Sequence, residues 1–241
     1  MTRLSTASVG ASEVFARLRT EILCGRLAPG TRLKFGTLTA ELGCSVASLR
    51  EALIALAAED LLDSERNRGF RVKPISAEAL QDLTQVRVDL ESLALRRAIE
   101  RGSAQWELDI LRAQHDLEAV PIADETTGQI SAAWMECHEQ LHATLVSGCG
   151  SPRLTSITAT IRTSLEVYWR ALEPLCRGTT EQLNAEHRAI VLPALARQTD
   201  AAVSALQANV LTTLEPMLKI LHERSETADS TGSPLDITPA V

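Results

Sequence analysis

The stretch between Leu33 and Val72 constrains the fold more than any other part of the chain, because helix and turn signals follow one another there. Residues 38–42 end a short apolar helix, Gly43 and the cysteine after it make a turn, and Ser45 is suited to cap the next helix. We expect that next helix to bury one apolar face over about three turns. This face consists of Val46, Leu49, Ala52, Leu53 and Leu56.

Two short apolar runs follow this helix, at residues 61–62 and 70–72. They are joined by polar residues 66–69, which end in glycine, and this pattern predicts a hairpin of short strands. Two helices separated by a turn and followed by a basic hairpin form the outline of a winged helix-turn-helix, an architecture that reads DNA.

Charge is distributed unevenly along the chain. Residues 1–75 contain 11 Lys and Arg against 8 Asp and Glu, which gives them a net charge of +3. The whole chain has a net charge of −7, so the remaining residues carry −10. The acidic total does not exclude DNA binding, because only the basic end has to meet the duplex.

The chain after residue 76 is rich in Leu and Ala with a period of about 3.6 residues, which predicts a helical bundle and a mainly α protein. Pro193 and Pro216 are expected to cause a kink or an early stop. We expect helices near 77–101, 104–118, 129–147, 152–172, 180–197 and 199–223. The predicted units are a DNA-binding domain at 11–74, an all-helical domain at 77–223 and a disordered tail at 224–241.

The sequence also suggests where the protein works. It has neither a long apolar run nor a charged-then-apolar leader, so we expect a cytoplasmic chain without a membrane partner, associated with the nucleoid when bound to DNA. Its five cysteines are odd in number, widely spaced and without a C-x-x-C pair. This pattern indicates free thiols rather than a disulfide framework or a zinc site built from cysteine.

Residues 11–74 contain four motifs that can be compared with known families. They are Gly25-x-Leu27-x-Pro29-Gly30-x-x-Leu33, Leu38-x-x-x-Leu42-Gly43-x-Ser45, Leu49-Arg50-Glu51-Ala52-Leu53-x-x-Leu56 and Asn67-Arg68-Gly69-Phe70-x-Val72. In sequence and spacing they resemble the amino-terminal domain of the GntR family of bacterial transcription regulators. The resemblance implies a homodimer that binds a palindromic operator in double-stranded DNA, most often as a repressor.

Several polar residues of this segment are candidates for DNA contact. Arg50 lies on the exposed face of the second motif helix, where a guanidinium can bond O6 and N7 of one guanine. The alternative for Arg50 is a surface ion pair with a nearby acid. Ser45 and Ser48 at the helix start can bond phosphates. The remaining candidates are Lys34, Arg66 and Arg68 for backbone or minor-groove contacts, and Gly69 for close approach of the wing.

The chain departs from the family pattern at two positions. Family members often carry an arginine directly after the capping serine, where this chain has Val46. They often carry another basic residue before the first motif helix, where this chain has Phe35-Gly36. We therefore expect an operator that differs from the common family site and a modest affinity for it.

Three of the five histidines are expected to face one interior. His138 and His142 are one helical turn apart, on the side that also carries Trp134. His187 lies on the apolar stripe of another helix. Imidazoles that point together can bind one divalent metal per chain, zinc first and nickel as an alternative. Otherwise they are hydrogen-bonded core residues, or they line a cavity that binds an effector without metal.

The helical half contains motifs of its own. They are Arg87-x-x-Leu90-Glu91, His142-x-x-Leu145 ahead of Gly150-x-Pro152-x-Leu154, and Glu186-His187-x-x-Ile190. These resemble the FCD domain, the effector domain of the FadR branch of the same family. Metal-containing members use an Asp and three His, but here the Asp position holds His138 and the last His position holds Asn209. The resemblance therefore leaves two alternatives, a three-histidine metal site and a metal-free pocket for an acyl or acyl-CoA-like ligand.

Arg87 falls on the apolar stripe of its helix, where a charge is costly unless it is paired. We expect it to point into the cavity and bind an effector carboxylate through two hydrogen bonds. The alternative is an ion pair with Glu91, one turn further on. Asn209 is a second candidate for effector binding. Glu136 and Glu139 are expected on a solvated face.

These observations predict a regulator whose operator affinity changes when a small organic acid binds the helical domain. A metal-dependent hydrolase, in which a three-histidine metal activates water, is the remaining alternative. It leaves the basic amino-terminal segment unexplained and lacks an inward acid or base beside the histidines. We therefore do not expect an enzyme.

Overall fold

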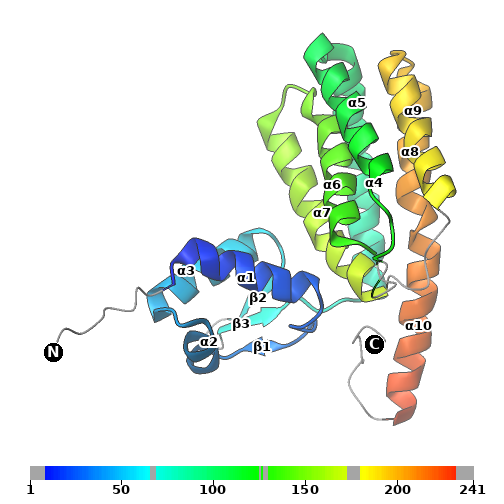
Figure 1. Cartoon of the computed structure of the whole chain (residues 1–241). Coiled ribbons are helices and arrows are strands. Elements are labelled where there is room, and N and C mark those ends of the chain that lie inside the picture. The colour runs from blue at the N-terminus through cyan, green and yellow to red at the C-terminus, as the bar shows by residue number, and fades with distance from the viewer. Residues whose placement is uncertain (1–8, 66–68, 125, 127–129, 173–179, 232–241) are drawn as a thin grey trace. The chain divides into compact units, whose positions relative to one another are not determined.

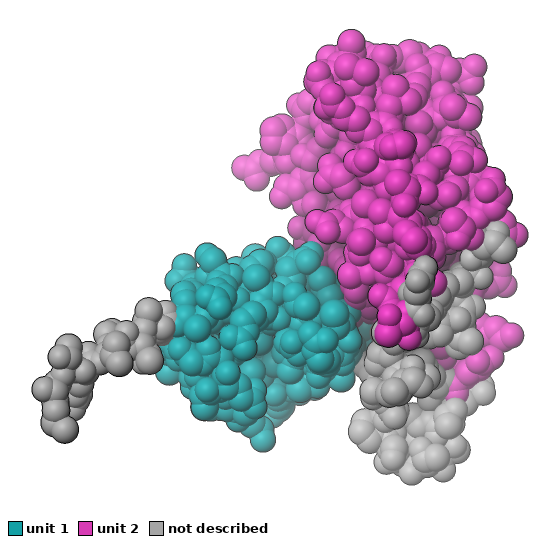
Figure 2. Space-filling model, viewed as in Figure 1, with its two compact units in different colours: residues 1–75, 236–241 teal, residues 76–235 magenta. Residues whose placement is uncertain are grey.

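The computed structural model describes residues 9–65, 69–124, 126, 130–172 and 180–231. They form two compact units, divided between Ile75 and Ser76, which Figure 2 shows in different colours. The fold is mainly α, as the sequence predicted. No helix of the described part is long and apolar enough to cross a membrane.

The first unit combines helices with a small antiparallel sheet (Figure 1). Its elements are α1 (Ala11–Leu23), β1 (Arg32–Leu33), α2 (Phe35–Leu42), α3 (Val46–Ala58), β2 (Leu62–Glu65) and β3 (Gly69–Val72). The strand order is β1-β3-β2, with Arg32 opposite Arg71 and Leu62 opposite Val72. This is the predicted winged helix-turn-helix. Residues 66–68, between β2 and β3, lie outside the described residues.

Local signals set the geometry of the helix-turn-helix. Gly43 ends α2 with a φ of 64°, in the left-handed region that favours glycine. The Ser45 hydroxyl caps α3 by accepting a hydrogen bond from the backbone N–H of Ser48 at 3.0 Å. The apolar face of α3 is buried as predicted, except at Val46, which is 56% exposed. That prediction was wrong because Val46 stands at the very start of α3, ahead of the turns that reach the core.

The second unit is a bundle of helices (Figure 1). Its helices are α4 (Ala77–Arg101), α5 (Ala104–Ala119), α6 (Ala132–Ser147), α7 (Pro152–Leu172), α8 (Thr180–Leu195), α9 (Thr199–Thr212) and α10 (Leu214–Thr231). The long helix α4 packs against α6, α7, α9 and α10. It is therefore the element around which the others are arranged.

Some helix ends differ from those expected. The segment expected as one helix at 199–223 is interrupted at Thr213, and Pro216 stands in the first turn of α10, where its missing N–H removes no helical hydrogen bond. Helix α8 passes through Pro193 but ends at Leu195. Helix α10 continues to Thr231, into the segment expected as a disordered tail, and residues 232–241 lie outside the described residues.

Trp106 of α5 fixes the position of α6, the helix that carries two of the candidate histidines. Its indole N–H donates a hydrogen bond to the backbone carbonyl of Thr144 at 2.9 Å. The ring also lies close to Gly102, where an added Cβ would be 2.2 Å from a ring carbon and 2.6 Å from the carbonyl oxygen of Ala98. Position 102 therefore requires glycine because the indole approaches so closely.

We expect Gly102→Ala to lower the free energy of unfolding by about 1–3 kcal/mol, because the new methyl group overpacks a filled site. Gly36→Ala is the matched control, because a Cβ there meets nothing within 4 Å inside α2. Alanine at that helical position should be neutral or stabilising by up to about 1 kcal/mol. Urea unfolding of both variants measures the difference, and equal stability of Gly102→Ala and the parent chain would contradict the packing argument.

Candidate functional site

The described candidates for DNA contact lie at or near the starts of α2, α3 and β3. Lys34, Ser45 and Arg50 are exposed, and the Ser45 and Ser48 hydroxyls are 3.0 Å apart, so they present their oxygens together. Gly69 has a φ of 87°, and a Cβ there would meet nothing within 4 Å. Backbone conformation rather than space therefore favours glycine in the wing. The two wing candidates Arg66 and Arg68 lie outside the described residues.

Arg50 contacts an aromatic ring rather than an acid in the part of the chain that the structure describes. Its guanidinium carbon lies 5.4 Å from the centroid of the Phe35 ring, a cation–π distance. Phe35 in turn packs on Phe70 of β3, with 6.4 Å between ring centroids. The Arg50 N–H groups therefore stay available for an external acceptor. Phe35, which stands where the family often has a basic residue, was not recognised from the sequence as a partner of Arg50.

The three predicted histidines do converge. The ring centroid of His138 lies 4.6 Å from that of His142 and 5.0 Å from that of His187. One nitrogen from each ring can be chosen so that all three lie within 4.8 Å of one another. Trp134 stacks on His138 with 5.0 Å between centroids and 20° between planes. The sequence prediction that these side chains share one interior is confirmed.

Burial keeps these imidazoles neutral. It lowers the pKa of His187 to about 4, and it holds the pKa values of His138 and His142 well below the usual 6.5. Nearby histidines and Arg87 lower the pKa of His142 further by charge repulsion. His187 donates from Nδ1 to the carbonyl of Leu183 at 2.7 Å, which leaves the lone pair on Nε2. A neutral imidazole with a free lone pair is the form that binds metal.

The donor atoms of this cluster fit a divalent metal. Nε2 of His142 and Nε2 of His187 are buried and have no hydrogen-bond partner among the described residues, which is costly unless a ligand reaches them. At Nδ1 of His142, Arg87 lies at 3.3 Å and can only donate, whereas Glu91 lies at 3.8 Å and can only accept. The contact with Arg87 favours the lone pair on Nδ1, whereas metal binding through Nε2 requires the proton on Nδ1, so His142 would have to change tautomer and give up this contact to bind a metal.

The side chain of Asn209 donates a hydrogen bond from Nδ2 to the carboxylate of Glu186 at 3.1 Å. This hydrogen bond is therefore directed to Glu186 and not to the histidine cluster. Glu186 precedes His187 on α8 but does not belong to the histidine cluster. The position at which the resemblance would place a last metal ligand is thus engaged with a neighbouring carboxylate.

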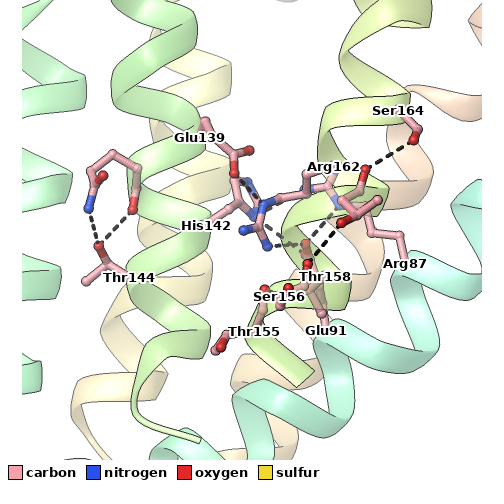
Figure 3. A network of polar contacts seen from close by, with 12 residues as sticks. Arg87, Glu91, Glu139, His142, Thr144, Thr155, Ser156, Thr158, Arg162 and Ser164 are labelled. Carbon is pink, nitrogen blue, oxygen red and sulfur yellow. Dashed lines mark hydrogen bonds and ion pairs between the residues drawn. The ribbon is translucent and has the colours of Figure 1, made fainter. Parts of the chain in front are cut away.

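A network of buried charges lies beside the histidines and joins α4, α6 and α7 (Figure 3). Glu91 on α4 is fully buried. Its Oε1 accepts a hydrogen bond from Nη1 of Arg162 at 2.9 Å and lies 3.3 Å from Nε of Arg87. Arg162 on α7 also donates from Nε to Glu139 on α6 at 2.8 Å. One carboxylate thus receives two guanidinium groups, and one of these guanidinium groups reaches a second carboxylate.

A pocket opens next to this network, with an atom-free volume of about 420 Å³ that includes the part open to solvent. It is lined by Arg87, Trp134, Met135, His138, Glu139, Arg162, Leu165, Glu166 and Trp169. Only about 30 Å³ of this space is enclosed cavity, enough for one or two water molecules, so a larger ligand has to lie in the open mouth or displace a side chain. The chemistry of the lining, two guanidinium groups beside apolar walls, favours a small molecule with an apolar body and an anionic end.

The structure changes the expectations for the charged residues. Arg87 lines the pocket, which was the expected orientation, and it also pairs with Glu91, which was the alternative. Glu136 is exposed as expected, and Glu139 keeps 45% of its side-chain exposure, but its carboxylate also pairs with Arg162 at the pocket, which the sequence did not predict. Arg162 was missed. Its only signal in the sequence is a charge directly after Ile161 on the buried side of α7.

Comparison with known proteins agrees with this architecture. Residues 11–72 match the family described as bacterial regulatory proteins, gntR family, and residues 82–211 match the FCD domain. The uncharacterized HTH-type transcriptional regulator BphR of Paraburkholderia xenovorans (strain LB400) is 31% identical over 200 residues, which cover 81% of this chain and 80% of that protein. The HTH-type transcriptional repressor GlaR of Escherichia coli (strain K12) is 29% identical over 198 residues, which cover 81% of this chain and 90% of GlaR.

Solved structures share the fold. The E. coli protein McbR/YncC superimposes with a TM-score of 0.67 at 17% identity, over 89% of this chain and 98% of that one. A putative GntR regulator from Rhodococcus sp. RHA1 gives a TM-score of 0.65 at 21% identity, over 87% and 97% of the two chains. The domain matches and the relatives identify a DNA-binding transcription regulator rather than an enzyme. This chain belongs to the GntR family, in the branch that carries an FCD effector domain.

Proposed function

We propose that this protein is a repressor that binds a palindromic operator as a homodimer and loses affinity for it when a small organic acid enters the FCD domain. The observation that carries the proposal is the pocket beside the histidines, where two guanidinium groups face a space with apolar walls. Its relative GlaR is named a repressor, which supports the sign of the response. A dimer would supply one DNA-binding domain for each half-site.

In this proposal α3 enters the major groove. Arg50 bonds a guanine edge, and its stacking on Phe35 limits the directions that the guanidinium can take. Ser45 and Ser48 bond phosphates near the amino-terminus of α3, where the helix dipole favours anions. Lys34, Arg66, Arg68 and the backbone at Gly69 add contacts to the DNA backbone or the minor groove.

We further propose that His138, His142 and His187 hold one divalent metal per chain, with zinc as the first candidate and nickel as the second. Three imidazoles leave a coordination position open, and the metal would supply positive charge that attracts an anionic effector. The second candidate is a metal-free pocket for an acyl or acyl-CoA-like ligand. It is favoured by His138 at the family's Asp position, because the cluster then has no anionic ligand, and by the engagement of Asn209 with Glu186.

We expect Arg50→Ala to weaken operator binding by about 1–3 kcal/mol, which corresponds to about five- to 150-fold, because it removes a bidentate contact to a guanine. The operator for this test is selected from random DNA with the parent protein, and fluorescence anisotropy at fixed salt gives the affinity. Arg26→Ala is the matched control, because Arg26 is exposed but pairs with Glu21 at 2.7 Å. The assignment of Arg50 fails if both variants bind the selected site as tightly as the parent.

The metal is tested by elemental analysis and native mass spectrometry of the purified protein. We expect one zinc or nickel ion per chain, lost in His142→Ala and retained in His115→Ala. His115 is the matched control because it is exposed on α5, outside the cluster. A dimer that carries no metal, even after incubation with zinc, would reject the three-histidine site and favour the metal-free pocket.

A further inference from the structure

The proposed effector pocket contains an arginine that is shared between two very different carboxylates. Arg162 donates from Nη1 to Glu91 at 2.9 Å and from Nε to Glu139 at 2.8 Å. The Glu91 side chain is 0% exposed, whereas the Glu139 side chain keeps 45% of its exposure. Glu139 can therefore reach water by rotating its own side chain, but Glu91 cannot leave without opening the bundle.

We propose that Glu139 is a displaceable partner of Arg162, and that the carboxylate of the effector takes its place on the Nε side of that guanidinium. The inference rests on the proposed function, which assigns this pocket to an organic acid. Arg162 is 3% exposed, and burying a guanidinium is costly when its N–H groups lack acceptors. The ligand carboxylate therefore replaces Glu139 as the acceptor on the Nε side of Arg162, and this side is not left unpaired.

Arg162 suits this exchange better than Arg87, the arginine singled out from the sequence. The partners of Arg87 are Glu91 at 3.3 Å and Nδ1 of His142 at 3.3 Å, and both of these residues are buried. Neither partner can move into water to free the guanidinium. Arg87 therefore holds Glu91 in place, while Arg162 exchanges one of its two acceptors.

When no metal is bound at the histidines, charge balance selects a single carboxylate. Arg87 and Arg162 carry two positive charges, which Glu91 and Glu139 balance. When Glu139 swings into water, one negative charge restores the balance, and a neutral amide of the same shape does not. Glu166, the other acid that lines the pocket, is held by Arg170 at 2.8 Å and is not free to replace Glu139.

The walls of the pocket determine the body of the ligand. Beyond the charged groups the lining consists of Trp134, Met135, Leu165 and Trp169. Indole faces and aliphatic side chains bind rings and short alkyl groups by burying apolar surface. The chemistry of these walls favours an aromatic or branched monocarboxylic acid, which needs the space that Glu139 leaves when it is displaced; benzoate is a simple probe.

Displacement of Glu139 also has a structural effect. The hydrogen bond from Arg162 to Glu139 ties α7 to α6, the helix that carries His138 and His142. Once the ligand carboxylate accepts this hydrogen bond in place of Glu139, the bond no longer joins α6 to α7, and the ligand lies between the two helices. Ligand binding would thus change the contact between α6 and α7 directly.

The test is isothermal titration calorimetry of the full chain with benzoate and with neutral benzamide. We expect Glu139→Gln to bind benzoate about tenfold more tightly than the parent, because the competing carboxylate is gone. Glu136→Gln, an exposed change on the same helix, is the matched control and should bind like the parent. Arg162→Lys should bind at least about tenfold more weakly, because a lysine cannot offer two directed N–H edges. Circular dichroism confirms that each variant is folded.

A gain in benzoate affinity for Glu139→Gln alone, with no binding of benzamide, supports the proposal. Equal benzoate affinity for Glu139→Gln and the parent, or no benzoate binding by Glu139→Gln, overturns it. A second measurement, release of the operator by the parent protein, separates failure of the displacement step from failure of the proposed function. If succinate or acetate releases the operator while the Glu139→Gln result is negative, only the displacement step is wrong. If no acid of this panel changes operator binding, organic-acid sensing itself is rejected.

Discussion

The burial of the Glu91 carboxylate is the constraint on which the helical domain depends. An ionised carboxylate inside a protein is costly unless charged and hydrogen-bonding partners surround it, and removing one partner of a buried pair typically costs about 3–5 kcal/mol. Glu91 obtains its partners from its own helix, through Arg87, and from α7, through Arg162. The relative placement of α4 and α7 is thereby fixed to within hydrogen-bond distance. Because a well-packed apolar core would stabilise such a bundle as well or better, we attribute the network to positioning of the pocket.

Features encoded locally in the sequence were predicted well. The turn at Gly43, the cap at Ser45 and the spacing of His138 and His142 depend on residues within one or two turns of each other. Backbone conformation and helical periodicity determine such features without knowledge of the rest of the fold. The prediction that His187 joins the other two histidines needed only the assumption that apolar faces meet in one core.

Features that depend on helix rotation and packing over long distances could not be predicted. The bond between Arg162 and Glu91 spans 71 positions of the chain, and nothing in either helix alone indicates which carboxylate the arginine will reach. Glu139 has an ordinary surface pattern in its own helix, and only the approach of Arg162 from α7 brings it to the pocket. The contact of Arg50 with Phe35 is similar, because it depends on the angle at which α2 and α3 meet.

The placement of the tryptophans has a practical consequence. The chain has three tryptophans, and two of them, Trp134 and Trp169, line the pocket. Both lie near the His138 ring, with centroid distances of 5.0 Å and 6.5 Å, whereas Trp106 is buried between α5 and α6. Emission from an indole is sensitive to a neighbouring imidazole, to a bound metal and to the polarity of its surroundings. The ultraviolet fluorescence of the protein is thus a built-in optical reporter of pocket occupancy, and any candidate molecule can be screened without a label or an attached dye.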